Sequence, residues 1–195
     1  MKEPDLLSRV RQECRAQHQR LEALLPFHES LTLADYRKVL ILFWGLFLPM
    51  EEALRKAEVP PSLDLCQRQR APLLARDLAA MGMPAEALTR LPRCPDIPPV
   101  NTTARALGCM YVLEGSTLGG QFIAKLARQR LGLTETSGCA FFFSHGEEVG
   151  RMWQSFCATV REHVLAPAAQ QDFIATAANT FSTFVRWLEE NHDER

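Results

Sequence analysis

The stretch Ala104–Leu126, ARALGCMYVLEGSTLGGQFIAKL, decides which kind of molecule this sequence encodes. Its apolar residues recur at three- and four-residue spacing, which is typical of a helix. Candidates for its N-cap directly precede it: Asn101, Thr102 and Thr103. Yet glycines stand in its middle, and each costs roughly 1 kcal/mol relative to alanine. Because glycine lets backbone come within contact distance of another body, the stretch predicts a close approach there.

The glycines suggest what approaches. Tyr111, Gly115 and Gly119 fall on one stripe at four-residue spacing, with Gly120 beside it. The stripe offers a polar ring and then two patches of bare backbone, against which a flat ligand could lie. Close glycines also allow the helix to kink over such a ligand.

The glycine spacing has two other interpretations, close helix packing and a phosphate-binding loop. The spacing Gly115-x-x-x-Gly119 also permits two helices to pack closely, as in membranes, but the charges of Glu114 and Lys125 argue against a membrane span. A phosphate-binding loop needs a preceding strand and Lys-Ser/Thr after its last glycine, where Gln121 and Phe122 stand here. The spacing alone leaves helix packing and a ligand surface equally open.

Composition bounds the class of protein. The chain has 195 residues, 47% of them hydrophobic, and a net charge of −1, so we expect one globular domain over residues 1–195 without affinity for nucleic acid. The opening MKEPDLLSRVRQE is charged and contains no apolar signal region. The longest apolar run, Val39–Met50, is too short for a bilayer. Six cysteines without a C-x-x-C pair indicate free thiols in a reducing cytoplasm.

The periodicity predicts helices along the whole chain and no strand. Besides the glycine helix, we expect helices over about 5–25, 32–57 with a kink at Pro49, 63–81, 147–165 and 169–190. Residues 91–100 contain four prolines and form a loop, while 131–145 form a connector whose run Phe141–Phe143 plugs the core. The expected fold class is therefore all-α, a single-domain bundle of six to eight helices.

The first expected helix carries a histidine on its apolar face. His18 follows Cys14 by four residues, and Glu22 lies four residues further on, within reach of one imidazole nitrogen. A carboxylate partner is typical of a ligating histidine, whereas a lone histidine on an apolar face is more often a satisfied core residue. Arg11, two turns earlier, suits an anionic group or is a solvated charge. The sequence contains neither G-x-S-x-G nor H-E-x-x-H.

Together these residues resemble a known family. The segment Tyr111–Gln121 resembles the distal helix of heme oxygenases, and His18 with Glu22 resembles the proximal iron ligand and its hydrogen-bonding partner. The helix order also matches over nearly the whole chain. This version of the motif is similar to bacterial heme oxygenases, particularly the biliverdin-producing enzymes associated with bacteriophytochromes.

The resemblance implies a function and its requirements. Heme b, both cofactor and substrate, would lie between the first helix and the glycine helix, with His18 on the iron and Gly115, Gly119 and Gly120 above it. The enzyme would open heme to biliverdin and release carbon monoxide and ferrous iron. It would consume dioxygen and electrons from a donor such as ferredoxin or a flavin reductase. A bacteriophytochrome is the implied acceptor of the biliverdin, and neither nucleic acid nor a membrane is implied.

The resemblance also assigns the remaining site residues. Arg11 and Arg161 would meet the heme propionates, Phe181 would be an aromatic at the side of the heme, and Tyr111 would either join a polar network or pack against the ring. Ser116 departs from the family, in which several members carry an aspartate that organises water above the iron. A hydroxyl can hold water but carries no charge. The competing hypotheses are a heme carrier or sensor without turnover and a helical interaction protein.

Overall fold

The computed structural model describes residues 5–28 and 30–191, and over these ranges the chain is all-α. Seven helices of eight residues or more form the body of the described part: α1 Leu6–Glu13, α2 Arg15–Leu24, α3 Leu33–Leu54, α5 Ala71–Ala80, α7 Thr103–Leu131, α9 Val149–His163 and α10 Pro167–Glu190. Short elements come in addition: α4 Leu65–Arg68, α6 Ala85–Leu88, α8 Ala140–Phe143 and the 3-10 turns η1 Pro61–Leu63 and η2 Gly146–Glu148. The all-α class is confirmed, and the long helices agree with the expected count.

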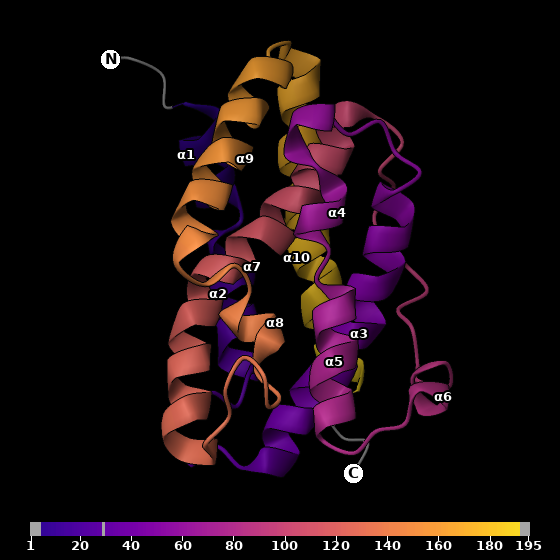
Figure 1. The fold of residues 1–195 in the computed structure, drawn as a ribbon. Coiled ribbons are helices and arrows are strands. Elements are labelled where there is room, and N and C mark those ends of the chain that lie inside the picture. The colour runs from indigo at the N-terminus through magenta and orange to yellow at the C-terminus, as the bar shows by residue number, and fades with distance from the viewer. Residues whose placement is uncertain (1–4, 29, 192–195) are drawn as a thin grey trace.

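Helix α10 is the centre of the packing. It contacts α7 along much of its length and also contacts α1, α2 and α3, while α5 packs on α3 and α9 on α7. In Figure 1 the second half of α7 and α9 lie on one side of the molecule and α3 and α5 on the other, with α10 behind them. Helices α2 and α7 therefore share α10 as a common support.

An aromatic cluster fills the core between these layers. Phe43 and Phe47 of α3 contact Phe141 and Phe184, with ring centroids 5.0–6.1 Å apart. Phe141 and Phe142 are both buried and confirm the expected plug from the 131–145 connector, whereas the prediction is wrong for Phe143, which is 38% exposed. Helix α3 starts as expected at Thr32, whose hydroxyl accepts a hydrogen bond from the N–H of Asp35 in a capping box.

The expected helix over 5–25 is wrong as a single element. The chain turns at Cys14, which has φ −88° and ψ 0°, and this turn separates α1 from α2. No proline or glycine marks the break in the sequence. Cys14 is only 2% exposed, so tertiary burial of this residue, rather than local propensity, fixes the turn.

The expected helix over 63–81 is also divided, into α4 and α5. Pro72 stands at the start of α5, and in a continuous helix its ring would meet the carbonyl of Arg68. The freed N–H groups of Arg70 and Ala71 donate to the Glu51 carboxylate at 2.6 and 3.1 Å. Both freed N–H groups therefore keep a hydrogen-bond partner at this buried position. The last helix starts at Pro167, two residues earlier than expected, because proline suits a first helical turn.

The glycine helix is the longest element. Its N-cap is Thr102, whose hydroxyl accepts from the N–H of Arg105 at 3.3 Å, and Gly132 ends it with φ 67°. Figure 1 shows that the ribbon of α7 bends midway, as close glycines allow. Within the described residues, no helix is both long enough and apolar enough to cross a membrane.

Candidate functional site

Residues that flank α2 lie near α7 at two places. At one end, Arg11 and Cys14 lie close enough to Tyr111 of α7 to affect its ionisation: the pKa of Tyr111 is raised to about 12, chiefly by burial and then by Cys14 and Cys157, while Arg11 lowers it. At the other end, Phe27 and His28 line one surface hollow together with Phe122 of α7. Between these landmarks the two helices advance in the same direction.

His18 and Gly115 occupy corresponding positions along the two helices. His18 lies four residues beyond Cys14 on α2, and Gly115 lies four residues beyond Tyr111 on α7. Helix α10 supports both, through Phe181 beneath His18 and Phe173 beneath Tyr111. Because α2 and α7 both pack on α10, the region bounded by these three helices, called the trough below, is the candidate ligand site.

The His18 imidazole is held from two directions. Its Nδ1 lies 3.5 Å from Oε2 of Glu22, within ion-pair distance but long for a hydrogen bond. Its ring stands edge-on to Phe181 at 5.5 Å between centroids, and the His18 side chain is 54% exposed. With Nδ1 turned towards a carboxylate, Nε2 is the nitrogen that can bind a metal.

The three glycines predicted to belong to the site, Gly115, Gly119 and Gly120, have different surroundings. A Cβ added to Gly119 would meet no atom within 4 Å, and one added to Gly115 would meet only the Trp153 ring, at 3.8 Å. A Cβ added to Gly120 would lie 3.0 Å from the carbonyl oxygen of Phe142 in α8. Gly119 thus presents open backbone, whereas Gly120 serves the contact between α7 and α8, and its role in a ligand site stays a prediction.

The surface around the open glycine is apolar. Leu118 is 44% exposed and Phe122 is 66% exposed, and large hydrophobic side chains of this exposure are few in the described structure. Together with bare backbone at Gly119 and an accessible imidazole on α2, this surface suits a flat, apolar ligand that contains a metal. The residues present therefore fit a porphyrin.

Two polar residues accompany this surface. The Ser116 hydroxyl donates to the carbonyl of Leu113 at 2.7 Å, so its oxygen lone pairs remain available to accept a hydrogen bond from water. The Tyr111 ring packs between Trp153 at 5.6 Å and Phe173 at 5.9 Å. Both roles predicted for Tyr111, in a polar network or packed against the ring of the ligand, stay predictions.

The two arginines predicted to bind carboxylates differ in engagement. Arg11 is exposed at the end of α1 and lies near Tyr111. Arg161 of α9 lies 3.7 Å from Asp5, the N-cap of α1, with its side chain 58% exposed. An ion pair this exposed contributes little to stability, so Arg161 can exchange Asp5 for another anion.

Several residues that pack behind the glycines were not predicted as part of the site. The ring of Trp153 in α9 is what a Cβ on Gly115 would meet. Glu114, the residue before Gly115, pairs with Arg68. Glu114, a charged residue in an apolar part of a helix, was the one signal that could have pointed to this pair. His145, in the turn that follows α8, is half-buried, and burial together with Arg70 and Arg68 lowers its pKa.

Comparison with known proteins identifies relatives over the same residues. The family model described as "Heme oxygenase" matches residues 4–190. A heme oxygenase of Xanthomonas campestris pv. campestris is 34% identical over 118 residues, which make up 60% of this chain and 66%, just under two thirds, of that protein. The heme oxygenase PigA of Pseudomonas aeruginosa is 29% identical over 174 residues, 88% of this chain and 85% of that protein.

A solved structure agrees with the fold. The heme oxygenase of Neisseria meningitidis, determined with NO and CO bound, superposes with a TM-score of 0.75 at 22% identity, covering 95% of this chain and 90% of that chain. At this identity the likeness concerns the arrangement of the helices alone.

Proposed function

Because the chain belongs to the heme oxygenase family, we propose that this heme oxygenase binds heme in the trough between α2, α7 and α10 and opens it to biliverdin, with release of carbon monoxide and ferrous iron. One observation supports the assignment of the site: His18 lies on α2 and the open backbone of Gly119 on α7, and both helices pack against α10. The bound heme supplies both the iron that activates dioxygen and the carbon that is oxidised.

His18 is the proposed axial ligand. Its Nε2 faces the trough because Nδ1 is turned to Glu22, and the edge contact with Phe181 limits rotation of the ring. A neutral imidazole donates less electron density to iron than a thiolate does, and thiolate donation favours early cleavage of the O–O bond. The Glu22 carboxylate, 66% exposed, increases the electron donation of the imidazole.

Gly115 and Gly119 form the opposite face. Since neither carries a side chain, backbone can lie against the porphyrin, and little room remains for ligands that do not bend along the ring. Ser116 holds a water molecule at the edge of this face through its free lone pairs. Tyr111 closes one end by packing on Trp153, and Arg11 with Arg161 neutralises the propionates.

Reaction with oxygen tests the function directly. The protein loaded with heme and given dioxygen and ascorbate should lose its Soret band, form biliverdin and release carbon monoxide, and catalase should not prevent this. His18→Ala is the matched control for bleaching by free hydrogen peroxide, a reaction that catalase suppresses. A heme complex that ends as stable ferric heme contradicts turnover and identifies the chain as a carrier or sensor.

The physiological context completes the proposal. An external donor such as ferredoxin or a flavin reductase supplies the electrons, and a bacteriophytochrome accepts the biliverdin. The likeness of the Tyr111–Gln121 segment to the bacteriophytochrome-associated enzymes supports this acceptor. Six unpaired cysteines, five of them buried, support a reducing, cytoplasmic location.

A further inference from the structure

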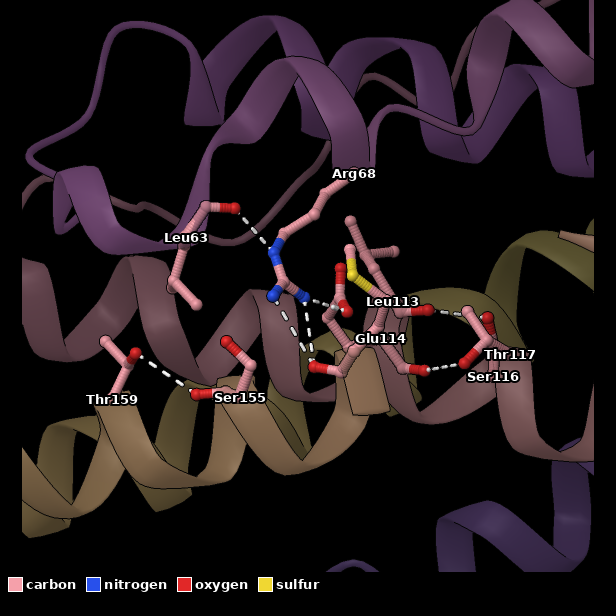
Figure 2. Close-up of polar contacts among 9 residues, drawn as sticks. Leu63, Arg68, Leu113, Glu114, Ser116, Thr117, Ser155 and Thr159 are labelled. Carbon is pink, nitrogen blue, oxygen red and sulfur yellow. Dashed lines mark hydrogen bonds and ion pairs between the residues drawn. The ribbon is translucent and has the colours of Figure 1, made fainter. Parts of the chain in front are cut away.

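A buried ion pair adjoins the glycine face. Arg68 of α4 donates from Nη1 to Oε2 of Glu114, and the two side chains are only 4% and 7% exposed. Glu114 directly precedes Gly115 on α7. Figure 2 shows the Arg68 guanidinium between the η1–α4 segment and α7, facing Glu114.

The same guanidinium holds two further elements. Its Nε donates to the carbonyl of Leu63 in η1 at 2.5 Å, and its two Nη atoms donate to the carbonyl of Met152 in α9 at 3.4 Å. Met152 directly precedes Trp153, whose ring is the nearest neighbour of Gly115. One side chain therefore anchors the residues on both sides of the contact between Gly115 and Trp153.

The α7 segment at this point needs external anchors. Its glycines have no side chains with which to hold their own position and weaken the helix. The hydroxyls of Ser116 and Thr117 donate back to the carbonyls of Leu113 and Glu114, both at 2.7 Å, as Figure 2 shows. Back-bonding of this kind favours bending of a helix. The direction of the segment is thus set by what holds Glu114.

From these contacts we propose that Arg68 is a positioning residue of this enzyme: through Glu114 and Met152 it fixes the spacing of Gly115 from Trp153, and thereby the height of the glycine face above the bound heme. The effect on heme rests on the proposed function, whereas the spacing of Gly115 from Trp153 is a property of the protein without heme. Neither Arg68 nor Glu114 touches the substrate.

The energetics of buried ion pairs separate positioning from stabilisation. Removing one partner leaves an uncompensated buried charge, whereas replacing both by apolar residues of similar volume is often neutral for stability. Apolar contacts, however, lack the direction of a guanidinium that donates to three elements. An apolar pair at positions 68 and 114 should therefore restore stability without restoring the position of α7.

The experiment compares Arg68→Met, the double variant Arg68→Met with Glu114→Leu, and Arg68→Lys. Arg105→Met is the matched control. Arg105 lies in the first turn of α7, away from the three site glycines, and pairs with Asp172 at 3.2 Å. Each variant is measured without heme, by its melting temperature and by hydrogen exchange of the amides of residues 115–120. With heme bound, the ferric absorption spectrum and the distribution of bilin isomers are recorded.

We expect the double variant to melt near the wild type yet to exchange the 115–120 amides roughly tenfold faster. It should also shift the ferric spectrum and mix the bilin isomers. Arg68→Lys should also speed hydrogen exchange of the 115–120 amides, because one ammonium group cannot replace the forked donors of the guanidinium. Arg105→Met should leave exchange of residues 115–120 unchanged.

Wild-type exchange and a wild-type ferric spectrum in the double variant overturn the proposal and leave Arg68 a purely structural role. Failure of Arg68→Met to fold does not affect this comparison, which depends on the double variant. Absence of turnover by the wild type counts against the proposed function alone, whereas normal turnover with unchanged exchange in the double variant counts against the positioning role alone.

Discussion

Gly119 offers a test in which stability and ligand binding should move in opposite directions. In the structure a Cβ at this position meets nothing within 4 Å, although the residue lies inside α7. Gly119→Ala should therefore stabilise the protein without heme by about 1 kcal/mol, the difference in helix propensity. For a chain of 195 residues this raises the melting temperature by about 2–4 °C.

The same methyl group should weaken heme binding. If the porphyrin lies against the backbone of Gly119, the added methyl acts as overpacking at a filled contact and costs about 1–3 kcal/mol. This corresponds to a dissociation constant roughly 5- to 150-fold higher. The assay is a pair of measurements on each variant, a thermal melt without heme and an absorbance titration with heme.

Two other glycines serve as controls. Gly150 lies in α9 and is also open, so Gly150→Ala should raise the melting temperature without changing heme affinity. At Gly120, overpacking against the Phe142 carbonyl outweighs propensity, so Gly120→Ala should lower stability by up to about 2 kcal/mol. The reasoning is refuted if Gly119→Ala melts below the wild type or binds heme equally well.

Three further variants test other assignments. His18→Ala should abolish the iron–histidine vibration of ferrous heme but change the melting temperature little, because the side chain is 54% exposed; a surviving vibration rejects the ligand. Ser116→Ala should slow ring opening with unchanged heme affinity, and an unchanged rate would leave water positioning to the backbone. Burial raises the pKa of Asp77 above 3.8 in the folded protein, so its contribution to stability is greatest below that pH and declines as the pH rises through the folded pKa. The excess melting temperature of the wild type over Asp77→Asn should thus be larger near pH 4 than near pH 7, and an opposite trend contradicts the raised pKa.

Features with a local cause could be predicted from the sequence. The caps at Thr32 and Thr102 and the bend in α7 follow from side chains within a few residues. The open stripe at Gly115 and Gly119 follows from a helical period and the absence of side chains. What the glycines contact could not be decided, since Gly119 and Gly120 are neighbours in the sequence but face a trough and α8, respectively.

Features with a distant cause escaped prediction. The break at Cys14 depends on burial by other helices. Pro72 indicates a helix boundary in the sequence, but the Glu51 carboxylate that caps α5 comes from a distant helix. Likewise, Arg68 and Glu114 are 46 residues apart, so no periodicity connects them. A charged residue in an apolar helix predicts that a partner exists without indicating where it lies.

The distribution of burial around the trough suggests why recognition and support are separate. The residues proposed to face the ligand, His18, Leu118 and Phe122, are largely exposed, and the glycines add no side chain at all. Such a surface cannot hold itself in place, because exposed groups contribute little packing energy. Rigidity must then come from the layer behind it, where Arg68 and Glu114 are almost fully buried and joined to α9. A site that binds its substrate through bare backbone thus depends for its geometry on residues that never touch that substrate.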